Sequence, residues 1–193
     1  MYKLCKTEQS AARQRQVEQC LLEIMQQQRY EDISVSDLCA RAEIPRKSFY
    51  RYFSSKDGAF HALLDHTMME YEAFSGPYGM GGQRSLERDL ERFFMFWLMK
   101  NPLLDVLSKS NLSGVLIERA IANSITEPTL PRRFLPQDQR PMQEQIMTFC
   151  VCGLLSMVMQ WHHAGYPQSP RDMAQTAVRL VTVPLFPDIE RMF

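Results

Sequence analysis

Apolar residues recur every three or four positions along almost the whole of this 193-residue chain. The first clear stripe consists of Val17, Cys20, Leu21 and Ile24. This is the spacing of one face of an amphipathic helix, which we expect to end near Gln28. No segment sustains the strict alternation of apolar and polar residues that is typical of a strand. The pattern therefore predicts an all-α protein.

Capping signals divide this pattern into separate helices. Ser34 is predicted to cap a second helix, because Asp37, three residues later, completes a capping box. Ile33 and Leu38 flank the same start as a hydrophobic staple. Pro45 suits the first turn of a helix, where its missing N–H would be unpaired in any case, and it opens a short third helix.

The same signals predict the rest of the fold. The sequence "SSKD", residues 54–57, caps a long fourth helix. Further helices are expected at 86–100, from residue 101 onward, and at 112–122, 142–164 and 169–183. Residues 123–142 contain four prolines and are predicted to be mostly loop.

The run "SGPYGMGG", residues 75–82, holds four of the eight glycines and interrupts the helical pattern. We interpret it as a linker. The predicted organisation is a small N-terminal domain (1–55), a connecting helix (56–75) and a larger C-terminal helical domain (83–193).

The helix predicted at 142–164 is apolar on almost every side. One stripe consists of Ile146, Phe149, Cys150, Gly153, Leu154, Met157 and Trp161, and other faces carry Val151, Leu155, Val158 and Met159. A helix of this kind has to be covered on more than one side. We expect its own domain core on one side and a second copy of the chain on the other, since closed twofold dimers are the commonest solution.

Overall composition is that of an ordinary soluble protein, with 45% hydrophobic and 23% charged residues and a net charge of zero. No apolar run is long enough to span a membrane, and the first residues lack the core of a signal peptide. These features predict a cytoplasmic protein without a membrane partner. Five scattered cysteines do not suggest a disulfide framework, and Cys150 and Cys152 are either core residues or a redox or metal element.

Positive charge is concentrated in one short segment. Residues 41–56 contain five basic residues and one acidic residue, whereas the chain from residue 61 onward carries a net charge of −2. The segment "IPRKSFYRYFSSKDG" also alternates basic and aromatic side chains. Two helices joined by a short turn, the second short and basic, form the layout of a helix-turn-helix. Its natural partner is double-stranded DNA.

The helix-turn-helix layout assigns roles to the individual residues. Arg46, Lys47 and Ser48 lie at the N-terminal end of the second helix, where side chains meet base edges. Contacts with the phosphate backbone are expected from Tyr50, Arg51, Tyr52 and Lys56. Phe49 and Phe53 are expected to anchor the helix to its small core. A solvated surface helix is the alternative interpretation of the same pattern.

The sequence "DISVSDLCARAEIPRKSFYRYFSSKD" resembles the signature of TetR/AcrR-type transcriptional regulators, and the resemblance covers about residues 13–65. It implies a DNA-binding domain followed by a variable helical domain that dimerises and usually binds an effector. In that pattern Ser34, Tyr50, Tyr52 and Lys56 match phosphate-contacting positions. The sequence departs from it at Glu43 and Lys47, where glycine is usual, and at Pro45, where serine is usual.

The sequence between the last two predicted helices also resembles that of this family. "WHHAGYPQSPRDMA" is similar to the junction between the last two helices of many members, which form a four-helix dimer interface. The resemblance implies a homodimer on a pseudo-palindromic operator, most simply a repressor that a small apolar effector releases. Candidate pocket residues, each of which is otherwise a plain core residue, are Phe93, Phe94, Trp97, Met147, Met157 and Trp161.

Two other classes of function remain open. The C-terminal domain can be read as binding a protein partner, which would make the chain a DNA-tethered interaction protein. An enzyme is not expected, because no nucleophile elbow, metalloprotease or dinucleotide-binding motif is present. No metal or cofactor is predicted, since His61 and His66 are five residues apart and His162 and His163 are adjacent.

Overall fold

The computed structural model covers the whole chain and describes residues 2, 3, 5, 7–76, 85–126 and 142–183. Within these ranges the protein is all-α and contains no strand, only an isolated bridge between Tyr2 and Phe53. None of the described helices combines the length and the apolar character needed to cross a membrane. The all-α prediction is confirmed.

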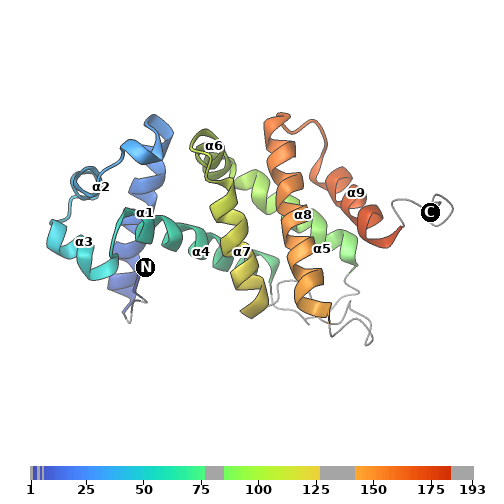
Figure 1. Cartoon of the computed structure of the whole chain (residues 1–193), viewed down its shortest axis with the longest axis horizontal. Coiled ribbons are helices and arrows are strands. Elements are labelled where there is room, and N and C mark those ends of the chain that lie inside the picture. Colours follow the sequence, from blue (N-terminus) through green and yellow to red (C-terminus); the bar gives the residue numbers. More distant parts are fainter. Residues whose placement is uncertain (1, 4, 6, 77–84, 127–141, 184–193) are drawn as a thin grey trace.

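Nine α-helices and one 3-10 helix are described (Figure 1). They are α1 (Glu8–Gln27), η1 (Tyr30–Asp32), α2 (Val35–Arg41), α3 (Arg46–Tyr52), α4 (Lys56–Ser75), α5 (Leu86–Met99), α6 (Asn101–Lys109), α7 (Ser113–Thr126), α8 (Gln143–His163) and α9 (Pro170–Thr182).

The first three helices pack together around buried apolar side chains. Val17 and Leu21 of α1, Leu38 of α2 and Phe49 of α3 are fully buried. The predicted capping box is present, since the Ser34 hydroxyl accepts from the Asp37 N–H and the Asp37 carboxylate accepts from the Ser34 N–H. Local signals and apolar spacing therefore agree in these three helices.

Helix α4 connects the two halves of the molecule. It packs against α1 on one side and against α5 and α7 on the other (Figure 1). Ser55 caps its start by accepting from the Gly58 N–H, as "SSKD" predicts. It ends at Ser75, and Gly76 follows with φ of +72°. The rest of the predicted linker, from residue 77, lies outside the described residues.

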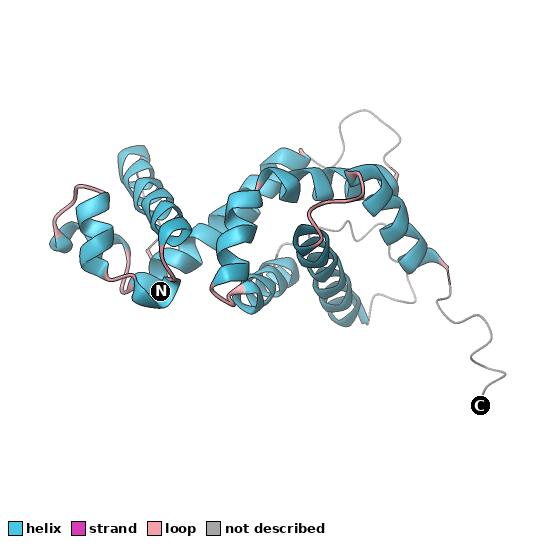
Figure 2. Ribbon diagram, turned by 90° about the horizontal axis from the view of Figure 1, so that it is seen from above, coloured by secondary structure: helices cyan, strands magenta, loops and turns pink. Residues whose placement is uncertain are grey.

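Helices α5 to α9 make up the C-terminal part of the described chain, in which α5 packs against α9 and α7 against α8. Figure 2 shows the described residues as helices joined by loops. The turn between α8 and α9 is fixed by the Trp161 Nε1–H, which donates to the Gln168 carbonyl at 3.0 Å. The Tyr166 hydroxyl donates to Asn101 Oδ1 at 2.6 Å and so ties this turn to α6. A second capping box, formed by Ser169 and Asp172, begins α9.

The all-round apolar character of α8 has a structural counterpart. Met147, Leu155, Val158, Met159 and Trp161 are buried within the chain, whereas the Phe149 side chain is 71% exposed. Gly153, one turn further along the same face, is also exposed. The stripe predicted from Ile146 to Trp161 is therefore split: its Trp161 end is buried, and its Phe149 edge points away from the chain's own core.

Several boundaries differ from the sequence prediction. Pro45 is the N-cap of α3 and does not occupy its first turn, because its ψ of 145° is extended. Helix α7 continues to Thr126, so the predicted loop begins later than residue 123, and residues 127–141 lie outside the described ranges. The pattern also gave no sign of η1, which three residues form without a side-chain cap.

Candidate nucleic-acid interface

The turn between α2 and α3 consists of the C-terminal hydrogen bonds of α2 followed by the extended Pro45. The Glu43 N–H donates to the Ala40 carbonyl at 3.3 Å, and the Ile44 N–H donates to the Cys39 carbonyl at 3.0 Å. Glu43 has φ of +52°, in the left-handed region where glycine is favoured. The geometry therefore explains why the related pattern usually has glycine at this position.

Helix α3 divides cleanly into a buried and an exposed side. Phe49 and Phe53 are buried, and their ring centroids lie 5.2 Å apart. Arg46, Lys47 and Arg51 are exposed, as is 46% of Tyr50. The predicted anchoring role of the two phenylalanines agrees with their burial. The exposed side brings Arg46, Lys47, Ser48, Tyr50, Arg51 and Tyr52 together on one helix.

Internal contacts already engage some of the positive charge in this region. The Arg41 guanidinium binds Glu23 of α1 through Nε at 3.1 Å and through a terminal nitrogen at 2.6 Å. A terminal nitrogen of Arg46 lies 3.5 Å from the Tyr50 hydroxyl, which orients both side chains along α3. Arg41 therefore braces α2 against α1, while the cations of α3 remain on the surface.

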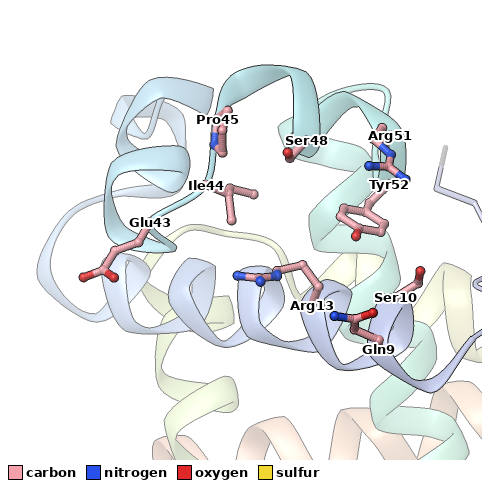
Figure 3. A pocket seen from close by; sticks show the side chains of 9 residues that line it. All are labelled: Gln9, Ser10, Arg13, Glu43, Ile44, Pro45, Ser48, Arg51 and Tyr52. Atoms are coloured by element: carbon pink, nitrogen blue, oxygen red, sulfur yellow. The ribbon is translucent and has the colours of Figure 1, made fainter.

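A polar groove of about 330 Å³ lies between α1 and α3 (Figure 3). Figure 3 shows the Arg13 side chain extending along α1 toward the Glu43 end of the groove, with Tyr52 and Arg51 at the other end. The groove is lined by Gln9, Ser10, Arg13, Glu43, Ile44, Pro45, Ser48, Arg51 and Tyr52.

Three of these groove residues, Gln9, Ser10 and Arg13, were not predicted from the sequence as part of the interface. They lie on the first turns of α1, where Ser10 and Arg13 precede Val17 by seven and four residues and so continue the helical face that carries the apolar stripe. The cation Arg13 in the segment "EQSAARQRQ" is the signal that was available. Its pairing with α3 depends on how α1 crosses the domain, which spacing along the chain does not reveal.

Two predicted contact residues lie outside α3. Ser34 caps α2, and its hydroxyl already accepts a backbone hydrogen bond. The Lys56 ammonium donates to the Tyr30 carbonyl at 2.6 Å and lies 4.4 Å from the centre of the Tyr30 ring. A longer contact of 3.4 Å joins it to the Glu31 carbonyl. Lys56 thus holds η1 against the start of α4, in addition to any role at the surface.

Most of the candidate pocket residues of the C-terminal domain form one aromatic cluster. Phe94, Trp97 and Trp161 are buried, Phe93 is half-buried, and Phe94 meets Trp161 edge-on at 5.8 Å. Met157 packs against this core, whereas Met147 is buried but not part of the same cluster. The Trp97 Nε1–H is buried and has no acceptor among the described residues.

Two of the histidines contact carboxylates. His66 Nδ1 lies within 2.9 Å of both carboxylate oxygens of the buried Glu18, and His162 Nε2 lies 2.9 Å from Asp105 Oδ1. Burial raises the pKa of Glu18, and the His66 contact partly offsets that rise. Cys150 and Cys152 are half-buried free thiols, and burial raises the pKa of Cys150.

Comparison with known proteins agrees with this geometry. The model of the family described as "Bacterial regulatory proteins, tetR family" matches residues 22–63, which span the end of α1, the turn motif and the start of α4. These residues of the chain are therefore similar to the N-terminal domain of tetR-family regulators. Regulators of this family are DNA-binding transcription factors and not enzymes. No curated protein sequence matches the chain.

Solved structures extend the likeness to the whole fold. The dihydroxyacetone kinase operon activator DhaS is 14% identical, with 88% of this chain and 93% of that chain covered and a TM-score of 0.56. The fatty acid degradation regulator FadR from Bacillus halodurans is 13% identical, with 94% and 98% covered and a TM-score of 0.56. A TetR-like transcriptional regulator from Rhodococcus sp. RHA1 is 18% identical, with 94% and 100% covered and a TM-score of 0.53. At these identities the likeness establishes a shared fold.

Proposed function

We propose that this chain is a tetR-family regulator that reads its operator by inserting the N-terminal end of α3 into the major groove. The observation that carries the proposal is the two-sided character of α3, with buried phenylalanines beneath exposed cations. Arg46 and Lys47 have the length and the donors to reach guanine O6 and N7. Ser48, half-buried at the groove edge, is placed to donate to a base or a phosphate.

We propose that residues around this helix contact the DNA phosphate backbone. Tyr50, Arg51 and Tyr52 lie further along α3, and Arg13 of α1 lines the same polar groove as Arg51 and Tyr52 (Figure 3). A phosphate seated there would meet donors from two helices, which fixes the orientation of the domain on the duplex. Ser34 retains its hydroxyl hydrogen as a donor, and Lys56 retains an N–H beyond the two that bind carbonyls.

We further propose that two copies associate through α8 and α9. On α8, Phe149 is 71% exposed, and a Cβ atom added at Gly153 would meet no neighbouring side chain or helix within 4 Å. On α9, Leu180, Val181 and Val183 just beyond its end are all exposed. Exposed apolar side chains of this kind are typical of an association site. A twofold dimer would place two copies of α3 about 34 Å apart, to match successive major grooves.

The effector site that we propose lies in the aromatic cluster of the C-terminal domain. The Trp97 Nε1–H supports a ligand, because a buried indole donor without an acceptor is costly to leave unpaired. A small, largely apolar molecule with one acceptor would satisfy it and shift the population toward a spacing of the two α3 helices that no longer fits the operator. If no small molecule binds at Trp97, the alternative proposal is favoured, in which the C-terminal domain binds a protein partner.

Repression is the direction of regulation that we propose, since a dimer covering two turns of a promoter excludes the polymerase. One structural relative is named an operon activator, so the direction has to be measured. The domain limits that accompany this proposal are 1–55 for DNA binding, 56–75 for the connection and 83–193 for dimerisation and effector binding.

The test is binding to DNA from just upstream of the chain's own gene, compared with random duplex at near-physiological salt. The native protein is expected to prefer the upstream DNA, and an Arg46→Ala/Lys47→Ala double variant to lose that preference. An Arg88→Ala/Lys109→Ala variant removes the same charge from exposed positions in the C-terminal domain and should bind like the native protein. Failure to bind either DNA, even at low salt, would contradict the proposal. A promoter–reporter assay then separates repression from activation.

A further inference from the structure

Three N-terminal residues, Tyr2, Lys3 and Cys5, form a strap across the DNA-binding domain. The Lys3 N–H donates to the Tyr52 carbonyl at 2.9 Å, and Tyr2 forms the bridge with Phe53. The strap is held from α1 as well, where Gln14 donates through Nε2 to the Lys3 carbonyl at 3.3 Å and accepts from the Cys5 thiol at 3.0 Å. One end of the strap is therefore attached to the last residues of the proposed recognition helix.

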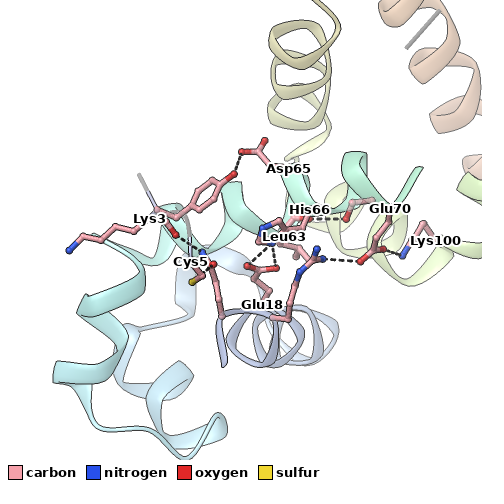
Figure 4. A network of polar contacts seen from close by, with 12 residues as sticks. Lys3, Cys5, Glu18, Leu63, Asp65, His66, Glu70 and Lys100 are labelled. Atoms are coloured by element: carbon pink, nitrogen blue, oxygen red, sulfur yellow. Dashed lines mark hydrogen bonds and ion pairs between the residues drawn. The ribbon is translucent and has the colours of Figure 1, made fainter. Parts of the chain in front are cut away.

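The Tyr2 side chain connects the strap to α4. Its hydroxyl donates to Asp65 Oδ2 of α4 at 2.8 Å (Figure 4). Asp65 is 7% exposed and is also bound by both arms of the Arg119 guanidinium of α7, with Nε at 2.8 Å from Oδ1. Burial and the Asp65 contact raise the pKa of Tyr2 to about 12, so the hydroxyl keeps the proton that it donates.

These contacts form one unbroken chain between the two domains. It runs from Arg119 in α7 through Asp65 in α4 to Tyr2, and from the Tyr2 and Lys3 backbone to Tyr52 and Phe53. Each link is a hydrogen bond, an ion pair or the backbone itself, and Asp65 has few solvent contacts to replace a lost partner. A displacement of α7 relative to α4 would therefore pull on the C-terminal end of α3.

We propose that Tyr2 is a positioning residue that couples the C-terminal domain to the recognition helix through its hydroxyl group. The inference deepens the proposed function and rests on it where DNA is concerned. In this arrangement α3 is held in its reading position only while α7 and α4 keep Asp65 in place. Release of the strap leaves the exposed side of α3 unchanged but loosens its last turn.

A neighbouring network provides an internal comparison. Arg15 of α1 binds Glu70 of α4 at 3.0 Å, and Glu70 also binds Lys100 beyond the end of α5 (Figure 4). Glu18 and His66 join α1 to α4 beside it, and the His66 ring meets Tyr2 edge-on at 5.8 Å. The Arg15 pair thus joins the same two halves of the molecule without passing through the strap, so weakening this more exposed contact spares the coupling route.

The decisive measurement is amide hydrogen exchange of the full-length protein without DNA. We expect Tyr2→Phe and Arg119→Lys each to speed exchange of the last turn of α3 and of the Lys3 amide by roughly fivefold or more. The double variant should not exchange faster than either single variant, because either substitution already interrupts the chain of contacts. The control Arg15→Lys should alter exchange only near α1 and α4. Thermal unfolding of every variant is followed in parallel, so that a global loss of stability is recognised.

The possible outcomes test the coupling through Tyr2 separately from the proposed DNA-binding function. Faster α3 exchange in Tyr2→Phe alone would mean that the strap acts only within its own domain, and unchanged exchange in both variants would overturn the role of Tyr2 altogether. Equal effects of Arg15→Lys on α3 would also overturn it. DNA binding by the same variants is then measured on the upstream duplex, where a roughly fivefold loss is expected for Tyr2→Phe. Absence of DNA binding by the native protein would refute the proposed function and leave the exchange result intact.

Discussion

Two exposed surfaces of this protein differ in chemical character: one is cationic and the other is apolar. The exposed side of α3 carries Arg46, Lys47 and Arg51 above a closed aromatic core. The exposed side of α8 and α9 carries Phe149, Leu180 and Val181 and few charges. The first surface is complete in one copy of the chain and suits a polyanion. The second leaves apolar area in water and suits another apolar surface.

The difference lies in what each surface requires of its partner. Cations on a surface are well solvated, so α3 needs no partner to be stable and gains from phosphates mainly through counterion release. Exposed apolar area is unfavourable by about 25 cal/mol per Å², so the α8–α9 surface favours association even without DNA. We therefore expect substitutions on the second surface to change assembly and those on the first to change recognition.

The largest effect is expected at Phe149. Glu at this position would place two charges against each other in the proposed interface, so Phe149→Glu should convert a particle of about 45 kDa, twice the 22.5 kDa chain, into a monomer. Because one DNA-binding domain then acts alone, affinity for the upstream DNA should fall by about 100-fold or more. Light scattering and DNA titration measure the two quantities.

A matched control tests whether position matters or only apolar exposure. Met99 of α5 is 66% exposed, close to the value for Phe149, but lies outside the α8–α9 surface. Met99→Glu should leave both mass and affinity unchanged. A monomeric native protein at micromolar concentration, or a monomeric Met99→Glu, would show that the two-surface interpretation is wrong.

The next effect concerns recognition by Lys47. Removal of a side chain that reads a base should weaken binding to the upstream DNA by about 1–3 kcal/mol, while binding to random duplex changes less. Lys47→Ala is compared with Lys3→Ala, an exposed lysine of the same domain on the strap. Equal losses on both DNAs would make Lys47 a phosphate contact, and no loss on either would remove it from the interface.

The DNA-binding domain could largely be predicted from sequence, because its information is local. The Ser34–Asp37 box, the buried Phe49 and Phe53 and the exposed Lys47 each follow from neighbours within a few residues. Contacts between distant segments could not be predicted. Arg13 faces α3 only because α1 crosses beneath it, and Tyr2 meets Asp65 across 63 positions of the chain. Spacing shows which side of a helix is polar but not what that side will meet.

The C-terminal domain shows the same limit in another form. The pattern indicates that α8 needs cover on more than one side, yet it placed Phe149 and Trp161 on one stripe. The structure separates them, since Trp161 packs against Phe94 while Phe149 is exposed. Residues on adjacent rows of a helix differ in burial according to which neighbouring helix lies over them, and for α8 that depends on the packing of α5, α6 and α7.

A smaller effect distinguishes the two domains through their capping boxes. Ser34 begins α2 and Ser169 begins α9 with the same reciprocal hydrogen bonds to an aspartate three residues later. Ser34→Ala and Ser169→Ala should each lower the free energy of unfolding by about 1 kcal/mol, measured by denaturant titration. Only Ser34→Ala should also weaken DNA binding, because its hydroxyl is a proposed phosphate contact. Equal DNA affinities would confine Ser34 to capping.

The smallest effect comes from three helix ends with the same hydrogen bonds. After α2, α6 and α8, the first position in the left-handed region is Glu43, Asn111 or Gly165, and in each case the next N–H donates five residues back. Glycine and asparagine are the usual residues there, so Glu43 is the strained member. Glu43→Gly should raise the free energy of unfolding by about 0.5–1 kcal/mol, measured by denaturant titration. Glu43→Gln removes the charge but keeps the Cβ atom, so a similar gain in that variant would mean that electrostatic repulsion, and not backbone strain, is the cost of Glu43.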